Sequence, residues 1–277
     1  MTLLKLFLGN LLVLLQPNKA QQLATNGMTL VIDDSLSFRE RLMRGAILAK
    51  AELAEDDQAL AQYHHDYWKN RGTEYFELTD DNFESVFMPD CSFVFDILEE
   101  KLQETEHEFT TLVEIGAGNG DITHYLSEKF PQIKQFIGID LSEAQTEKNR
   151  EKYKDHPKLN FVAGDAFEWI ENNGSSNMIF VTSRGVLEYF TQKRLLVLLK
   201  MISFFNRVIF VAIEPNGLDH DFMKNPGSQP YGNERSFSHN YMAYFKEAGF
   251  ELAHISRKVY AENDHSLSFI VAQSGVD

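Results

Sequence analysis

The stretch Leu112-Val113-Glu114-Ile115-Gly116-Ala117-Gly118-Asn119-Gly120-Asp121 joins an apolar strand directly to a glycine-rich turn and the start of a helix. Three glycines stand there at alternate positions. A side chain at these positions would keep the backbone from lying against a ligand, and would resist the dihedral angles of a tight strand-to-helix turn. A glycine-rich loop alone is a weak signal, because an ordinary tight turn has the same composition. The segments on either side therefore decide its meaning.

Short β-branched segments alternate with helical segments after residue 110. The spacing predicts strands at 111–115, 136–140, 159–165, 178–182 and 208–213, with helices beginning near residues 121, 142, 166 and 191. Such alternation is typical of a mostly parallel sheet covered on both faces. Two further strands, at 251–260 and 266–272, are joined by the short turn 261–264 and form a hairpin. We expect an α/β fold with a seven-stranded, mostly parallel sheet and an antiparallel terminal hairpin.

Residues 1–109 carry helical patterns, and we expect them to form an N-terminal helical cap, or lid, on an α/β domain at 110–277. Helix-spaced apolar positions run through 36–71, with a Ser-x-x-Glu capping box at Ser37 and Glu40 and with Gly72 as the expected stop. Turn-rich stretches at 79–82 and 88–90 then lead into a second predicted helix at 93–102.

The almost entirely apolar run at 3–15 has three interpretations. It is 13 residues long, whereas a membrane span needs about 20, and Lys5, Gly9 and Asn10 interrupt it. A signal peptide would carry its positive charge before the apolar region and a small-residue cleavage site after it, but Lys5 stands inside the run. We therefore expect a helix that packs on its own protein or on a second subunit, which leaves a homodimer through this segment open.

The composition excludes several classes of protein. With 43% hydrophobic and 24% charged residues, the chain has enough apolar material for a sizeable core. Its 26 Lys and Arg residues against 41 Asp and Glu residues give a net charge of −15, which repels nucleic acid and anionic lipid. We expect neither partner and no stable membrane span. The single Cys91 forms no intrachain disulfide and no multi-thiolate zinc site, which fits a reducing compartment and a cytoplasmic location.

Two acidic residues end the strands beside the glycine loop. Asp140 comes 20 residues after Gly120, at the spacing of an acid that accepts hydrogen bonds from ribose hydroxyls. Asp165, in Gly164-Asp165-Ala166, ends the following strand. Because the carboxyl ends of parallel strands meet at one edge of the sheet, both acids and the glycine loop are expected to face one crevice.

These segments resemble the class I S-adenosylmethionine-dependent methyltransferases over about residues 111–277. The resemblance lies in Glu-x-Gly-x-Gly-x-Gly at 114–120, Ile137-Gly138-Ile139-Asp140-Leu141-Ser142, Gly164-Asp165-Ala166, the strand 179–183 with Gly185-Val186-Leu187-Glu188-Tyr189 after it, and the terminal hairpin. This combination is specific to the fold and the cofactor, and it is not specific to the substrate.

The resemblance implies S-adenosylmethionine as cofactor and gives roles to residues of this chain. Gly116 and Gly118 would lie under the methionine portion, with Glu114 supporting its amino end. Asp140 would take the ribose hydroxyls and Asp165 the adenine amino group. The implied cofactor-binding set is Glu114, Gly116, Gly118, Gly120, Asp140, Leu141, Asp165, Ala166, which is the backbone partner of adenine, and Ser183, whose backbone closes the methionine side.

Physical arguments favour this cofactor over NAD. A dinucleotide site usually carries Gly-x-Gly-x-x-Gly, which lets the pyrophosphate rest on a helix N-terminus, but here the third glycine comes one residue early. Asp121 opens the helix, and its carboxylate would oppose a pyrophosphate. The sulfonium and amino groups of S-adenosylmethionine are attracted by acidic residues near the loop. NAD remains a minor alternative.

The acceptor side offers several candidates. Methyl transfer is an in-line displacement on an activated carbon, so the protein aligns the acceptor, excludes water and, for some acceptors, removes a proton. Glu188, Tyr189, Glu214 and His239 are the candidate catalytic residues, and Asn216 and Tyr241 are candidate substrate contacts. For His239 a structural interpretation competes, because Ser238 as N-cap of the helix that ends at Gly249 would leave His239 exposed in the first turn.

The predicted cap contributes aromatic residues at helical spacing. Tyr63 and Tyr67 are four apart, as are His64 and Trp68, so each pair shares a helix face. Tyr63, Tyr67 and Trp68 are expected either to pack the cap on the sheet or to form a lid over the sulfonium. Adjacent histidines such as His64 and His65 point about 100° apart on a helix, and no thiolates join them, so we expect no metal site.

Three functions remain open on the sequence. The first is a small-molecule O- or N-methyltransferase in small-molecule biosynthesis, because a helical cap encloses a small acceptor better than a macromolecule. The second is displacement at the aminocarboxypropyl carbon, or intramolecular cyclisation, with release of methylthioadenosine. The third is a non-catalytic cofactor-binding protein.

Overall fold

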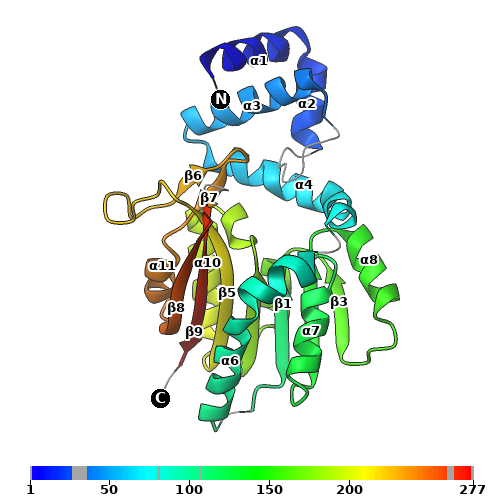
Figure 1. Ribbon diagram of the computed structural model, residues 1–277, viewed down its shortest axis with the longest axis vertical. Coiled ribbons are helices and arrows are strands. Elements are labelled where there is room, and N and C mark those ends of the chain that lie inside the picture. The colour runs from blue at the N-terminus through cyan, green and yellow to red at the C-terminus, as the bar shows by residue number, and fades with distance from the viewer. Residues whose placement is uncertain (1, 27–35, 80–81, 107, 261–264, 276–277) are drawn as a thin grey trace.

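The computed structural model describes residues 2–26, 36–79, 82–106, 108–260 and 265–275 (Figure 1). Its seven-stranded sheet has the order β3-β2-β1-β4-β5-β9-β8. The strands are β1 (Thr111–Ile115), β2 (Gln135–Asp140), β3 (Leu159–Ala163), β4 (Met178–Ser183), β5 (Val208–Gly217), β8 (Glu251–Tyr260) and β9 (His265–Ser274). The first five are parallel, and β9 pairs antiparallel with both β5 and β8. The expected α/β fold is confirmed, while the turn at 261–264 lies outside the described residues.

The burial of each strand agrees with its position in the sheet. Every residue of β1 and β5 is buried, as expected for central strands with helices on both faces. Along β8, partly buried positions alternate with exposed ones from Glu251 to Arg257, as expected for an edge strand with one wet face. β5 continues to Gly217, beyond its expected end at 213, because its last residues pair with the first residues of β9.

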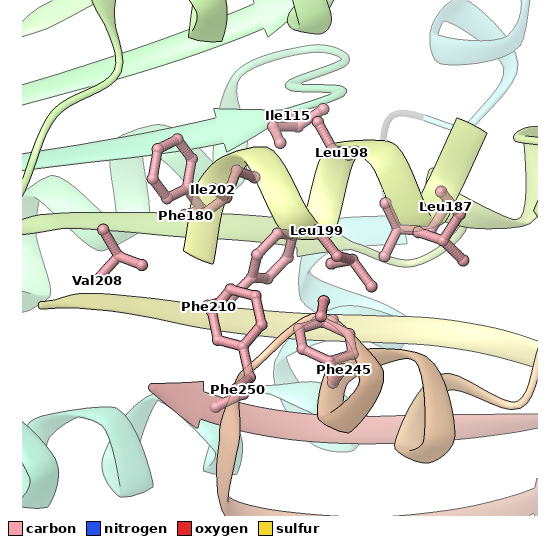
Figure 2. Close-up of a cluster of buried hydrophobic side chains, with 14 of the residues drawn as sticks. Ile115, Phe180, Leu187, Leu198, Leu199, Ile202, Val208, Phe210, Phe245 and Phe250 are labelled. Atoms are coloured by element: carbon pink, nitrogen blue, oxygen red, sulfur yellow. The ribbon is translucent and has the colours of Figure 1, made fainter. Parts of the chain in front are cut away.

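Helices cover both faces of the sheet. They are α6 (Phe93–Glu104), α7 (Asp121–Lys129), α8 (Glu143–Lys152), α9 (Ala166–Asn173), α10 (Gln192–Phe204) and α11 (Tyr241–Glu247). Figure 2 shows Leu199 of α10 on the side of Phe210 of β5 and Phe245 of α11, while Leu198 lies beside Ile115 of β1. The opposite face packs against α6 and α7 through residues such as Phe95 and Leu126. The ends of the parallel strands are therefore held rigidly at one edge.

Four helices precede this layer: α1 (Leu3–Leu15), α2 (Pro17–Thr25), α3 (Phe38–Leu53) and α4 (Asp57–Leu78). The Ser37–Glu40 capping box is confirmed, with both reciprocal hydrogen bonds present. The expected helical stretch 36–71 is broken at Glu55, which has a positive φ of 53°. Gly72 is not the stop, because α4 continues through it to Leu78. Gly72 instead lies against Ser142, next to the Thr73–Ser142 hydroxyl contact of 3.2 Å.

One further sequence expectation needs correction. Residues 88–90 form no turn, since the π-helical segment η1 (Phe83–Phe87) runs straight into α5 (Met88–Cys91), where Pro89 is tolerated in the first turn. Of the turn expected at 79–82, residues 80 and 81 lie outside the described ranges. η1, α5 and α6 pack on the sheet through Phe87 and Phe95. The division of the chain at 109/110 stays a prediction.

A two-stranded hairpin that the sequence did not reveal lies between β5 and α11. It consists of β6 (Gln229–Tyr231) and β7 (Ser236–Ser238). Ser238 is thus not the N-cap of the following helix. Asn240 takes that position and accepts from Ala243 N, and His239 is fully buried rather than exposed. Phe237 packs with residues of α2, α3 and α4, which fixes the hairpin to the cap (Figure 1).

Helix α1 packs on α3 through the side of the helix that carries Gly9. Gly9 is buried against α3, where an ideal Cβ would lie 2.2 Å from the carbonyl oxygen of Leu42. Most of the apolar residues of α1 face solvent: Leu3, Leu4, Phe7, Leu8, Leu11, Leu14 and Leu15. Within the described ranges, no helix combines the length and the apolar character needed to cross a bilayer.

Phe237→Ala is expected to lower the free energy of unfolding by about 3–5 kcal/mol, because it empties a fully buried site between the hairpin and the cap. Urea denaturation measures this change. The matched control is Phe204→Ala, whose ring is 83% exposed, and it should change the free energy by less than about 0.5 kcal/mol. Equal effects of the two substitutions would contradict the packing described above.

Candidate cofactor and acceptor site

A cavity of about 670 Å³ lies at the carboxyl ends of the parallel strands. Its floor is formed by the residues that end β1, β2 and β4 and by the loops after them, including Gly116, Asp140 and Ser183. Helix α4 and the β6–β7 hairpin supply the facing wall, with Trp68, Phe76 and Tyr231. The cavity therefore joins the sheet edge predicted from the sequence to elements far from it in the chain.

The glycine loop is held against β2 by its backbone. Gly116 N and Ala117 N both donate to the carbonyl oxygen of Ile139, at 2.8 and 3.0 Å. Gly116 and Gly118 have φ values of 75° and 52°, which favour glycine. An ideal Cβ on Gly116 would lie 2.6 Å from Val186, and one on Gly118 2.6 Å from the ring of Phe76. Side chains at these positions would push the loop away from its neighbours.

Asp140 connects the loop to the next helix. Its Oδ2 accepts from Gly118 N at 2.9 Å and its Oδ1 from Ser142 N at 2.8 Å. Burial raises the pKa of Asp140 to about 6, against these hydrogen bonds, which lower it. Asp140 and Leu141 both line the cavity, and their contact with a cofactor stays a prediction.

Glu114 lies beneath the floor rather than along the cavity. It is fully buried and accepts hydrogen bonds from the hydroxyls of Thr123 and Ser183. Burial raises the pKa of Glu114 to about 7. Gly118 and Gly120 are likewise absent from the lining in the described part of the chain, so the contact of these three residues with a cofactor stays a prediction.

Asp165 and Ala166 line the cavity where β3 runs into α9. The Oδ1 of Asp165 accepts from Phe167 N at 2.8 Å and caps the helix. Its Oδ2 pairs with the guanidinium of Arg194, which lies 4.4 Å from the centroid of the Phe167 ring. Arg194 thereby forms one end of the cavity.

The loop after β4 supplies the opposite end. Glu188 and Tyr189 both line the cavity. Glu188 accepts from the hydroxyl of Tyr231 at 2.5 Å, and burial raises its pKa. The ring of Tyr189 lies 5.6 Å from Trp68 and 5.0 Å from His64, centroid to centroid. Residues of α4, of the β4 loop and of the hairpin thus meet here.

Comparison with known proteins finds similar sequences and similar folds. Residues 112–204 match the family model described as a methyltransferase domain. Among solved structures, magnesium protoporphyrin IX methyltransferase from Synechocystis with bound SAH is 14% identical with a TM-score of 0.52, covering 76% of this chain and 97% of that one. The N-methyltransferase NodS from Bradyrhizobium japonicum is 12% identical with a TM-score of 0.52, covering 74% and 98%.

The match at 112–204 is to a methyltransferase domain, and the fold of the chain is that of the class I methyltransferases. The resemblance expected from the sequence is confirmed in this respect. A curated relative, the trans-aconitate 2-methyltransferase of Acidovorax sp. (strain JS42), is 41% identical over 58 residues. That match spans 21% of this chain and 21% of the relative's length.

Several residues that the sequence analysis predicted for the acceptor side do not line the cavity in the described ranges. They are Glu214, His239, Asn216, Tyr241, Tyr63 and Tyr67. Glu214 is fully buried and holds the β4 loop, since its Oε2 accepts from Val186 N at 3.1 Å and from Leu187 N at 3.0 Å. Sequence reasoning placed it just past the end of β5, but that strand continues beyond it.

His239 acts on the same loop. Its Nδ1 lies 2.6 Å from the hydroxyl of Ser228, and its Nε2 lies 3.1 Å from the carbonyl oxygen of Leu187. Burial lowers the pKa of His239 to about 3, so the ring is neutral at physiological pH. Asn216 in turn donates to the carbonyl oxygen of His239 at 2.8 Å. These side chains form a buried scaffold behind Glu188 and Tyr189, and their contact with a ligand stays a prediction.

The sequence analysis missed most of the facing wall. Tyr75 and Phe76 were assigned beyond the expected end of their helix, and Tyr231 and Glu234 lie in a hairpin too short to show a strand pattern. Arg184, the residue after β4, has a positive φ of 64°. The local sequence gives no sign of this backbone conformation. A signal for Phe76 did exist, because it lies eight residues after Trp68, on the same helix face.

Glu214→Gln is expected to flatten the pH dependence of stability. Burial raises the pKa of Glu214 from 4.5 to about 8, so this carboxyl stabilises the fold fully below pH 4.5 and loses that contribution as the pH rises towards 8. Urea denaturation at several pH values across this window measures the effect. Glutamine removes the titration, so the variant should lose less stability between the two pH values than the natural chain. Glu100→Gln, at an exposed position on α6, serves as control and should keep the natural slope.

Proposed function

We propose that this protein is an S-adenosylmethionine-dependent methyltransferase that methylates a small-molecule acceptor by in-line displacement. The observation that carries the proposal is the single cavity that runs from the acidic strand ends to the aromatic wall of α4 and the hairpin. Its volume of about 670 Å³ is in the usual range for small-molecule and cofactor sites. The methyltransferase domain at 112–204 supports the reaction class.

The strand-end residues suit the parts of S-adenosylmethionine. Each oxygen of Asp140 accepts one backbone N–H, and a carboxylate offers about four acceptor positions, so capacity remains for ribose hydroxyls. An ideal Cβ on Gly164 would meet no atom within 4 Å, so space for a ring is open beside it. Asp165 would share its carboxylate between Arg194 and the adenine amino group. Gly116, Leu141, Ala166 and Ser183 complete the proposed contacts.

The chain's own residues would orient the acceptor and exclude water. S-adenosylmethionine supplies an activated methyl group when it is bound. Trp68 contacts both Phe76 and Tyr189, with ring centroids 6.1 and 5.6 Å away, and these apolar faces limit the water around the acceptor. Glu188 faces the cavity with a raised pKa, which suits a carboxylate that accepts a proton from the acceptor.

A small acceptor fits better than a macromolecule. The wall opposite the strand ends is made by α4 and by the β6–β7 hairpin, and Phe237 fixes these two elements to each other. Such a wall encloses a small molecule, whereas a folded macromolecule would need an open approach. The net charge of −15 is a further argument against nucleic acid, and together with the single buried Cys91 it supports a cytoplasmic protein.

Purified protein incubated with S-adenosylmethionine, first alone and then with a metabolite extract, is expected to release S-adenosylhomocysteine only when the extract is present. Mass spectrometry of the nucleoside product measures this. Methylthioadenosine would instead indicate displacement at the aminocarboxypropyl carbon, and binding without turnover would indicate a non-catalytic binder. Calorimetry that detects no binding of S-adenosylmethionine or S-adenosylhomocysteine, with NAD bound instead, would overturn the proposal.

We also propose a homodimer through α1, whose outer face carries seven exposed large apolar residues. A second copy suits this face better than a membrane, because an anionic lipid surface would repel a chain of net charge −15. The face itself carries one charge, that of Lys5, so two copies can meet there with little repulsion.

Phe7→Ser combined with Leu11→Ser is expected to convert the dimer into a monomer, because both side chains lie on the exposed face of α1. Light scattering coupled to size exclusion gives the mass of each form. Val197→Ser combined with Phe204→Ser, at exposed positions on α10, is the matched control and should stay dimeric. A monomeric natural chain would contradict the dimer, and vesicle binding by that monomer would point to a membrane occupant.

A further inference from the structure

The acceptor end of the cavity combines aromatic rings with carboxyl groups. Trp68 lies at the centre, with ring centroids 5.3 Å from Tyr75, 6.1 Å from Phe76 and 5.6 Å from Tyr189. Tyr231, Glu188 and Glu234 line the same cavity from the β4 loop and the hairpin. We call this set the acceptor wall: Trp68, Tyr75, Phe76, Glu188, Tyr189, Tyr231 and Glu234.

The two carboxyl groups of the acceptor wall lack a full counter-charge in the protein. Glu188 is 7% exposed, and its hydrogen-bond partners are the neutral side chains of Tyr231, Ser236 and Tyr189. Burial and the neighbouring Glu188 raise the pKa of Glu234 to about 8, although the guanidinium of Arg44 lowers it. Burying a carboxylate is costly unless a cation accompanies it. A positively charged ligand would supply the missing charge.

The basic residues that line the cavity lie elsewhere or are already engaged. Among the described residues they are Arg184, Arg194, His65 and His265. Arg194 pairs with Asp165 at the end predicted for adenine. His65 contacts Asp66, and the ring of His265 stacks on that of Tyr260. The charge of Arg184 acts on Asp90 of α5 and on Tyr75. Arg184 thus lies near Tyr75 at one side of the acceptor wall, while the electrostatic partners of Glu188 and Glu234 include one cation, Arg44, among the described residues.

We propose that the acceptor is an amine that enters the cavity as an ammonium ion and is held by the aromatic faces and the two carboxylates of the acceptor wall. This inference rests on the proposed methyltransferase function. Aromatic faces attract cations through their quadrupole, most strongly when the cation is desolvated and the ring is tryptophan. A carboxylate acceptor would meet the buried Glu188 and the half-buried Glu234 instead, which opposes transfer of the trans-aconitate relative's printed substrate to this chain.

Methyl transfer to an ammonium acceptor requires a proton transfer first. An ammonium nitrogen has no free electron pair, so its N–H proton must first pass to the Glu188–Glu234 pair. The nitrogen pair then forms the N–C bond to the methyl group, and the C–S bond of the donor breaks with its electron pair kept by sulfur. The products are the methylated ammonium, the neutral thioether and a protonated carboxyl group, which returns its proton to water when the product leaves.

Three probes of similar size test the charge preference. Choline and 3,3-dimethylbutan-1-ol have the same shape and differ in a trimethylammonium against a neutral tert-butyl group, while 3,3-dimethylbutanoate carries the tert-butyl group and a carboxylate in place of the hydroxymethyl group. Ligand-observed NMR titration measures their affinities for the protein with and without S-adenosylhomocysteine. We expect choline to bind about ten-fold more tightly than the alcohol, and the carboxylate more weakly still. Equal affinities, or a preference for the carboxylate, would overturn the proposal.

Variants locate the preference. Glu188→Gln and Glu234→Gln should each reduce the ratio of choline to alcohol affinity by about three-fold or more, while Glu100→Gln, with the same change of charge on α6, should leave the ratio unchanged. Trp68→Leu should reduce it through the loss of the ring. Circular dichroism checks the folding of each variant, and the comparison of the three probes on the natural chain needs no variant. An unchanged ratio in both folded glutamine variants would contradict the role of the acceptor wall.

The pH provides a separate measurement. Glu234 faces Glu188, Arg44, Tyr67, Tyr75, Tyr189 and Tyr231, and the pKa values of these tyrosines are raised, so they stay neutral. Because the pKa of Glu234 is raised to about 8, choline affinity should increase as the pH rises through this value, whereas the affinity of the alcohol should stay constant. A choline affinity that falls with pH would overturn the inference. Failure of S-adenosylhomocysteine to bind would instead overturn the proposed function, since the probes are also titrated without it.

Discussion

The hydrogen bonds between the glycine loop and the end of β2 are the constraint on which the site depends. Gly116 N and Ala117 N share the carbonyl oxygen of Ile139, and Gly118 N binds the carboxylate of Asp140. These contacts tie the turn after β1 to the turn after β2 through the loop backbone and one carboxylate. The positions of Asp140 and of the helix that begins after Ser142 follow from the backbone of the loop, so the cofactor edge is preformed.

A second layer of buried acids holds the opposite loop. Glu214 accepts from the backbone of Val186 and Leu187, while Glu114 binds the hydroxyls of Thr123 and Ser183. Both carboxyl groups have raised pKa values because they are buried, so each is a polar support in an apolar region and not a free charge. They place Glu188 and Tyr189 at the cavity from behind. The acidic residues singled out in the sequence thus fall into two groups. Asp140, Asp165 and Glu188 line the cavity, whereas Glu114 and Glu214 hold the surrounding backbone and side chains in place.

The parts of this structure that could be predicted are those that local sequence determines. Strand and helix periods predicted β1 to β4, and the positive φ values of the glycine loop follow from a residue type that tolerates them. The rest depends on distant partners. The extension of β5 past Ile213 requires pairing with β9, and this extension decides that Glu214 lies inside the sheet. The three-residue strands β6 and β7 are stabilised by Phe237 against the cap, a contact that no local pattern contains.

The same division explains why the cofactor edge is easier to recognise than the acceptor. The edge is formed by consecutive turns, whereas the acceptor wall combines α4, the loop after β4 and the hairpin, which are separated by up to about 170 residues along the chain. Its charge arises only when Glu188 and Glu234 are brought to one cavity and Arg194 is drawn away by Asp165. Because the frame of β1 and β2 is fixed by backbone contacts, changes in the acceptor wall alter the acceptor's environment without disturbing the loop. Selectivity for the acceptor therefore depends on α4, the loop after β4 and the hairpin. The charge that these elements bring to the cavity could not be predicted from the local sequence.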